Sequence, residues 1–137
     1  MAKLEQEVAS ITGYVTDKAG LEFCYTDTLP ESFAYPAIYF PAPEFDTGYS
    51  TLSAYKLDYR MSVRFFDVNN QSAYRRAQTV ANALVAERYR IPLLGEDGPT
   101  GTFFKVSSTD VKKIDTGVYG FNITWESIRT FDDIPEQ

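Results

Sequence analysis

The chain has 137 residues, with 13 Lys or Arg, 19 Asp or Glu and no His, so its formal net charge is −6. A chain of this length forms one ordinary domain that needs no disulfide or metal to fold. Its acidic balance removes the long-range attraction to phosphate that most nucleic-acid binders and anionic-membrane binders use. We therefore expect no specific nucleic-acid partner and no membrane partner.

Residue types that carry common enzyme chemistry are missing. The absence of His removes the commonest general base, the nucleophile pairs that depend on it and imidazole metal ligands. The single cysteine, Cys24, excludes an internal disulfide and a zinc-binding cysteine cluster. The glycines of residues 95–101 lack the Lys and Ser/Thr of a phosphate-binding loop, and the adjacent acids at 96–97 and 132–133 are typical of solvated turns and tails. We expect no enzyme activity, no cofactor and no bound metal.

The N-terminal part of the chain predicts one helix and two short strands. Apolar residues recur at helical spacing over residues 3–16. Weak alternation predicts a short strand over residues 21–26. Residues 34–40 favour a strand that starts at Pro36 or lies at a sheet edge, because proline cannot donate a ladder hydrogen bond. Residues 41–53 are interpreted as a long, aromatic loop.

The clearest pattern covers residues 55–66, where apolar and polar residues alternate strictly. This is typical of a long antiparallel strand with one buried face. A helix follows, capped by Asn70 or Ser72 and continuing to about residue 88. Its predicted buried stripe consists of Tyr74, Ala77, Ala81, Leu84 and Val85.

The last third of the chain predicts strands separated by turns. Residues 95–101 form a turn, residues 102–108 a strand, and residues 110–114 a shorter strand. A tight turn at 115–117 precedes an alternating strand that starts at Val118. The order of elements predicts a single α+β domain over residues 1–137, with an antiparallel or mixed sheet and both helices on one face. Residues 131–137 are expected to be a flexible acidic tail.

Charge and aromatic residues are distributed unevenly, which predicts a subunit interface. Residues 1–50 are acidic, whereas residues 69–91 are basic. Opposite patches on one small domain suit head-to-tail self-association, although on charge alone ordinary solvated charges are the simpler explanation. Apolar residues on both faces of strands and in loops exceed what a monomer needs. The predicted interface residues are Arg75, Arg76, Arg88, Arg90, Phe45, Tyr49, Asp132 and Asp133.

Three blocks of the sequence follow one another in an informative order. They are the proline-led strand at 35–44, the strand and amphipathic helix at 55–84, and the turn with an alternating aromatic strand at 110–126. In this order the chain resembles the tail terminator and tail-completion proteins, or head-tail joining proteins, of long-tailed bacteriophages. The long loop at 41–53 departs from that pattern.

The resemblance implies a structural protein of the virion that is assembled in the bacterial cytoplasm. Such a protein forms a homo-oligomeric ring, usually a hexamer, that caps the tail tube and contacts the head connector. DNA passes through the lumen of the ring without specific binding. Two alternatives remain: another connector or tube component, and a small-ligand-binding α+β domain in which Asp58 or Arg60 points inward beneath the sheet.

Overall fold

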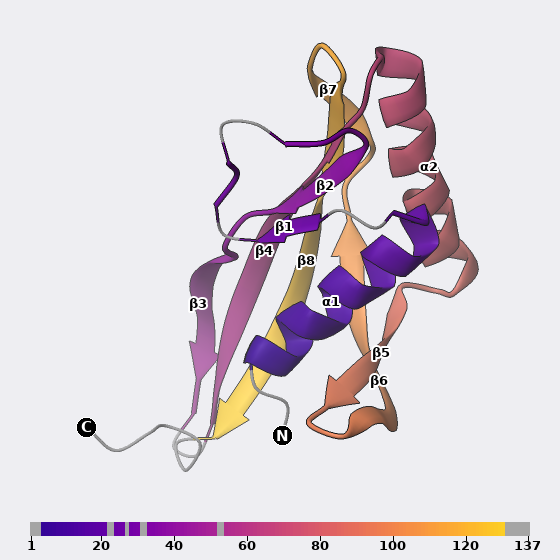
Figure 1. Ribbon diagram of the computed structural model, residues 1–137. Helices are drawn as coiled ribbons and strands as arrows, with labels where there is room; N and C mark the ends of the chain where they lie inside the picture. Colours follow the sequence, from indigo (N-terminus) through magenta and orange to yellow (C-terminus); the bar gives the residue numbers. More distant parts are fainter. Residues whose placement is uncertain (1–3, 22–23, 27, 31–32, 52–53, 131–137) are drawn as a thin grey trace.

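The chain forms an α+β domain in our computed structural model, which describes residues 4–21, 24–26, 28–30, 33–51 and 54–130 (Figure 1). Side chains are not described at Tyr49 and residues 128–130. The elements in chain order are α1 (Leu4–Ala19), β1 (Cys24–Thr26), β2 (Ala37–Phe40), β3 (Glu44–Ser50), β4 (Ala54–Phe66), α2 (Asn70–Ala86), β5 (Arg90–Gly95), β6 (Gly98–Ser108), β7 (Lys112–Asp115) and β8 (Val118–Thr130).

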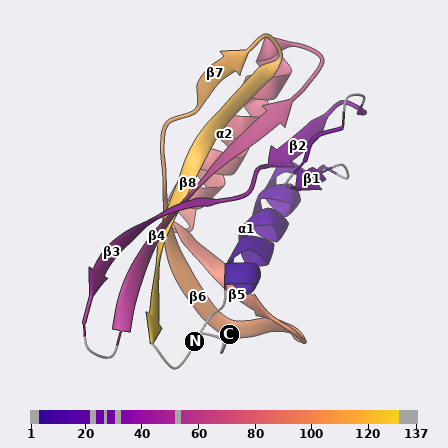
Figure 2. The ribbon, with the colours of Figure 1, turned by 90° about the vertical axis from the view of Figure 1, so that its left-hand side faces the viewer.

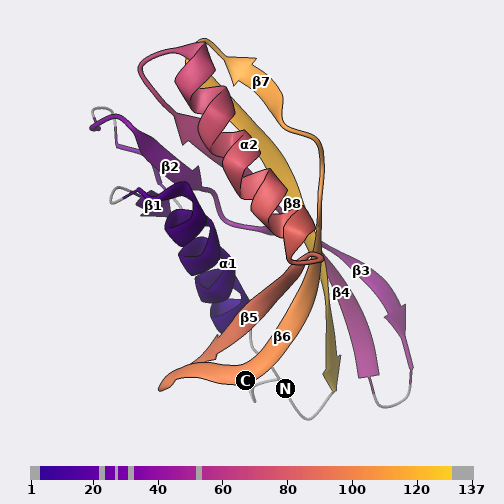
Figure 3. The same cartoon turned by 90° about the vertical axis from the view of Figure 1, so that its right-hand side faces the viewer.

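The described strands form one mixed sheet of eight strands, in the order β1-β2-β4-β8-β6-β5. The short strand β3 adds to the free side of β4, and β7 adds to β8. The centre is the antiparallel β4–β8 ladder, which runs from Ala54↔Thr130 to Phe66↔Val118. Only β1 and β2 pair in parallel among these strands. The sheet curls into a half-barrel, and both helices lie on its inner face (Figures 2 and 3).

The core fills the space between the inner face and the helices, as the alternation predicted. On β4 the buried side chains include Tyr59, Met61, Val63 and Phe65, and their partners on β8 are Trp125, Ile123, Phe121 and Tyr119. The helices contribute the buried residues Ile11, Val15, Ala77, Val80 and Leu84. The strand predicted at 55–66 and its buried face are therefore confirmed. The alternate side chains of β4 and β8 form an outer face that carries no helix.

Both helices differ in detail from the prediction. Helix α1 continues through Gly13 to Ala19, and Gly20 follows it with a positive φ of 67°. Helix α2 is capped by Asn69, whose side chain accepts a hydrogen bond from the Ser72 amide, so the cap lies one residue before the predicted Asn70.

The buried face of α2 is also rotated relative to the predicted stripe. Tyr74 is 44% exposed and Val85 is 57% exposed, whereas Ala73 and Val80 are buried. Ala77 and Leu84 are buried as predicted. Several stripes along the α2 sequence are similarly apolar, so the helical period alone does not select the buried one. The contact of α2 with β8 determines which stripe is buried.

Two strands occupy segments that were predicted as loops or left unassigned. Strand β3 lies inside the predicted loop at 41–53, where it pairs with β4. Strand β5 contains Pro92 and pairs with β6, so the predicted turn at 95–101 shrinks to residues 96–97. Strand β2 starts directly after Pro36, which is the first of the two expected alternatives, and it lies between β1 and β4 in the sheet. Neither helix in the described ranges is long and apolar enough to cross a bilayer.

Candidate interaction surfaces

In the part of the chain that the structure describes, adjacent acidic residues do not form a metal-binding cluster. No group of three or more Cys, Asp or Glu side chains is placed there to hold a metal ion. Glu96 and Asp97 are exposed in the β5–β6 turn. Asp132 and Asp133 lie outside the described residues.

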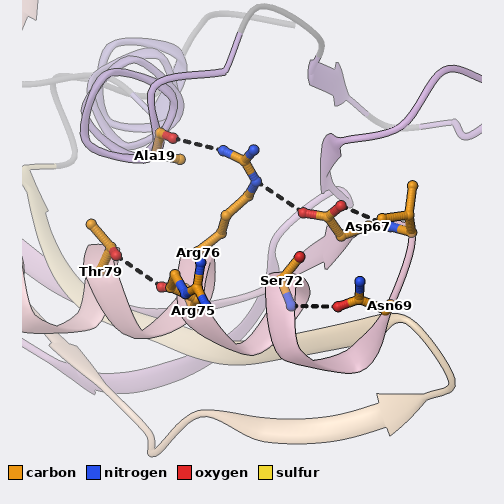
Figure 4. A network of polar contacts seen from close by, with 8 residues as sticks. Ala19, Asp67, Asn69, Ser72, Arg75, Arg76 and Thr79 are labelled. Carbon is orange, nitrogen blue, oxygen red and sulfur yellow. Dashed lines mark hydrogen bonds and ion pairs between the residues drawn. The ribbon is translucent and has the colours of Figure 1, made fainter.

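Arg76, one of the predicted interface residues, is occupied by contacts within the chain (Figure 4). Its Nε donates to Asp67 Oδ2 over 2.9 Å, and its Nη1 donates to the Ala19 carbonyl over 3.3 Å. The Asp67 side chain is only 6% exposed, and its Oδ1 accepts from the Val68 amide. Arg76 thus connects α2 to the end of β4 and to the end of α1.

Arg75, the next residue along the helix, is in a different environment. Its side chain is exposed, and its carbonyl oxygen accepts a hydrogen bond from Thr79 within α2 (Figure 4). No ion pair joins the Arg75 guanidinium to another residue in the described ranges. Among these two neighbouring arginines, Arg75 is therefore the one available to a partner.

Arg88 and Arg90 lie at the junction of α2 and β5, next to an exposed aromatic ring. Arg88 and Tyr89 have positive φ angles of 59° and 60°, which are uncommon for residues other than glycine. The Arg90 guanidinium lies 5.6 Å from the ring centroid of Phe103, which is 59% exposed. Neither arginine has an ion pair with a described residue. We call Arg88, Arg90 and Phe103 the arginine surface.

At the edge of the sheet, strand β3 presents acidic side chains on the outer face and one exposed ring on the opposite face. Phe45 is 60% exposed, and its ring lies 5.9 Å from that of Tyr59. Glu44 is 74% exposed and accepts a hydrogen bond from Arg60, and Asp46 is exposed nearby. Among the described strands β3 pairs only with β4, so its other edge is open. We call Glu44, Phe45 and Asp46 the β3 surface.

The β3 surface and the arginine surface are well separated. Strands β4, β8 and β6 lie between β3 and β5 in the sheet (Figure 3). The free side of β5 is covered by α1, where the Leu94 amide donates to the buried hydroxyl of Ser10. The free edge of β3 is therefore more exposed than that of β5. Open strand edges readily pair with a strand of another chain.

The outer face of the sheet carries a network of ion pairs near the C-terminal ends of β3 and β8. Lys56 Nζ lies 2.9 Å from Glu126 and 3.4 Å from Asp58, and the hydrogen bond to Glu126 raises the pKa of Lys56. Arg60 pairs with Glu44. Asp58 and Arg60 both lie on this outer face, so the inward orientation that the ligand-binding alternative requires is not met.

An aromatic cluster that the sequence pattern does not predict lies on the outer face near β1 and β2. The Phe33 ring lies 5.7 Å from Tyr25, 5.2 Å from Tyr35 and 5.1 Å from Phe66, all edge-on. Tyr35 is 54% exposed. No periodic signal joins these residues, since Phe33 and Tyr35 lie outside the strands.

The two helices are also linked by a polar cluster near the arginine surface. The Tyr14 hydroxyl donates to Glu87 Oε2 over 2.5 Å, and Lys18 Nζ lies 3.0 Å from Glu87 Oε1. The hydrogen bond from Tyr14, followed by Lys18, lowers the pKa of Glu87. Burial, followed by the bond to Glu87, raises the pKa of Tyr14.

Two proteins of Bacillus subtilis (strain 168) are similar to this chain. The uncharacterized protein YqbJ is 34% identical over 113 residues, which cover 82% of this chain and 77% of YqbJ. The phage-like element PBSX protein XkdJ is 29% identical over 125 residues, which cover 90% of this chain and 85% of XkdJ. No protein-family model matches the chain. Both similarities extend over most of the domain.

Proposed function

Since the chain belongs to the same family as YqbJ of Bacillus subtilis, and is homologous to XkdJ, we propose that it is a structural component of a phage tail. The observation that carries this proposal is the similarity to a PBSX phage-like element protein over 90% of the chain. Within the tail, we assign it the role of terminator: a ring that caps the tail tube and joins it to the head connector.

The surfaces described above suit a ring. A ring needs a heterologous contact, in which one patch of each copy meets a different patch of the next. The arginine surface and the β3 surface differ in charge, and each presents one exposed ring, Phe103 or Phe45. Charge complementarity fixes the orientation of such a contact, while the buried aromatic rings contribute most of the affinity.

The proposed role is structural and involves no catalysis or cofactor. The protein would be located at the head-tail junction of the particle, in contact with the tube protein and the connector. A net charge of −6 per copy suits a passage through which DNA moves without binding, because like charges repel the phosphate backbone.

Genetic complementation in a phage or inducible element that carries this gene tests the role. Deleting the gene should give tails that are overlong or not joined to heads, as seen by electron microscopy, and the wild-type gene should restore normal particles. Tails of normal length on full heads in the deletion strain would contradict a terminator. An open polymer of the purified protein would instead indicate a tube subunit.

Variants of the arginine surface test the proposed contact. Arg88→Glu with Arg90→Glu should leave the monomer folded but reduce complementation, whereas Arg88→Lys with Arg90→Lys keeps the charge and should complement. Arg75→Glu separately tests whether the exposed side of α2 belongs to the interface. Arg76 is left unchanged because its contact with Asp67 supports the fold.

A further inference from the structure

Two basic side chains lie on the outer face near β7, which is at the top of Figure 1. Arg64 of β4 and Lys112 of β7 are exposed and line one hollow. Both pair with Gly120, whereas Lys113 pairs with Tyr119, the partner of the buried Phe65, and so projects from the other face. Neither Arg64 nor Lys112 has an ion pair with an acid in the part of the chain that is described. In a chain with a net charge of −6, exposed bases without an ion pair suit an acidic partner. We call Arg64 and Lys112 the basic patch.

Gly120 of β8 lies between these bases and pairs with Arg64 on one side and with Lys112 on the other. A β-carbon at Gly120 would collide with the Val63 carbonyl oxygen and would lie 3.0 Å from the Ile114 side chain, so this position excludes a side chain. Two strand spacings separate Arg64 from Lys112, about 10 Å between their backbones. The patch therefore has a cation on each side of Gly120, with the Ile114 side chain beside it.

We propose that the basic patch binds the acidic segment at residues 131–137 of a second copy of this chain. The segment FDDIPEQ contains three acids and no base. In an extended chain, adjacent side chains project to opposite sides. An extended segment that binds between the two bases therefore directs Asp132 toward one base and Asp133 toward the other.

The same copy cannot make this contact. Gly120 and Thr130 lie near opposite ends of β8, separated by ten residues of strand, or about 33 Å. Asp133 lies three residues beyond Thr130, a reach of about 10 Å at most. The acidic segment must therefore come from another molecule, and it links copies without using the β3 surface or the arginine surface.

Charge also favours a protein segment over nucleic acid at this patch. The exposed acids Asp110 and Asp115 lie just before β7 and at its last residue, and the molecule as a whole repels phosphate. A short acidic segment brings only local charge to the basic patch. A DNA duplex has to approach the acidic remainder of the face as well.

Peptide binding in solution tests the contact. A fluorescein-labelled peptide with the sequence of residues 130–137 is titrated with the full chain carrying Asp132→Asn and Asp133→Asn, which removes competing segments. We expect saturable binding by fluorescence anisotropy, weakened at least tenfold by Arg64→Gln with Lys112→Gln. Lys105→Gln, at an exposed lysine of the lower outer face, should not change the affinity.

Several results would overturn the proposal. They are equal affinity for the Arg64/Lys112 variant, equal binding of a peptide with Asn for both Asp residues, or binding of a DNA duplex to the patch with no peptide binding. Circular dichroism checks that each variant is folded. Arg88→Glu with Arg90→Glu should leave peptide binding unchanged, so a failure of the proposed ring contact is distinguishable from a failure of this one.

Charge exchange in the full chain gives a second test. Arg64→Glu with Lys112→Glu should reduce self-association in sedimentation velocity. Adding Asp132→Lys and Asp133→Lys to the same chain should restore it, because the charges are exchanged across the same contact. If the fourfold variant associates no better than the double variant, the pairing is wrong.

Discussion

At the scale of single residues, the adjacent Arg75 and Arg76 differ in their contacts and should therefore differ in their contribution to stability. We expect Arg76→Ala to destabilise the fold by on the order of 2–3 kcal/mol, because it leaves the buried carboxylate of Asp67 without its ion-pair partner. Arg75→Ala should change stability by less than about 0.5 kcal/mol. Urea unfolding followed by tryptophan fluorescence measures both, and equal midpoints for the two variants would refute the assigned role of Arg76.

This difference was not predictable from the sequence. Arg75 and Arg76 both fit the exposed side of an amphipathic helix. What distinguishes them is Asp67, nine residues earlier in the chain, and the carbonyl of Ala19, which reaches the site only through tertiary packing. Hydrophobic periodicity contains no information on which charged side chain meets a buried partner.

At the scale of elements, the contact between the two helices should make stability depend on pH. The lowered pKa of Glu87 contributes stability above its ordinary value of 4.5, which is lost as the pH falls through the folded-state value. The raised pKa of Tyr14 contributes stability below pH 10, which is lost as the pH rises further. We expect Glu87→Gln to flatten the acid side of the profile and Tyr14→Phe the alkaline side.

Melting temperature measured from pH 3 to pH 11 checks these expectations. Glu96→Gln, in the exposed turn between β5 and β6, is the matched control and should follow the wild-type profile. A wild-type profile identical to that of both helix variants would show that the contact between Tyr14 and Glu87 does not contribute to stability.

Two glycines in different elements should respond to alanine in opposite directions. Gly13 lies inside α1, and a β-carbon there would meet nothing closer than Leu94 at 3.9 Å, so Gly13→Ala should stabilise by about 0.5–1 kcal/mol through helix propensity. Gly120→Ala should destabilise by at least about 2 kcal/mol, since it forces β8 away from Val63. Thermal unfolding of both variants decides it, and a shift of the same sign in both would contradict this explanation.

How well the sequence predicts each strand depends on its hydrophobic alternation and on how much of it is buried. Strands β4 and β8 were predicted because one face of each is buried over most of its length, which imposes a period of two. Strand β3 was missed because its sequence, EFDTGYS, contains no alternating apolar run, and its place depends on the ladder with β4. Strand β5 was missed because Pro92 indicates a break when the neighbouring strand is unknown.

The candidate surfaces were predicted only in part, for a related reason. The basic character of residues 69–91 and the exposed ring of Phe45 were visible in the sequence. The basic patch was not, since Arg64 and Lys112 are 48 positions apart and meet only because both pair with Gly120. Register across the sheet decides such clusters, and the sequence alone does not specify it.

At the scale of the whole molecule, the balance between net repulsion and local attraction should govern assembly. Each copy has a net charge of −6, so copies repel one another at long range while the proposed contacts attract at short range. The Debye length falls from about 30 Å at 0.01 M salt to about 10 Å at 0.1 M and 3 Å at 1 M. Moderate salt therefore screens the long-range repulsion before it weakens close ion pairs.

We accordingly expect wild-type self-association to rise with salt up to roughly 0.1–0.15 M and to fall toward 1 M. In Arg88→Glu with Arg90→Glu, two reversals of two charge units each take the net charge from −6 to −10 and leave acids on both proposed surfaces. In this variant salt only weakens the repulsion between copies, so its self-association should increase steadily with salt concentration. Sedimentation velocity across the series measures both curves. If wild type and variant show the same trend, the arginine surface does not carry the contact between copies.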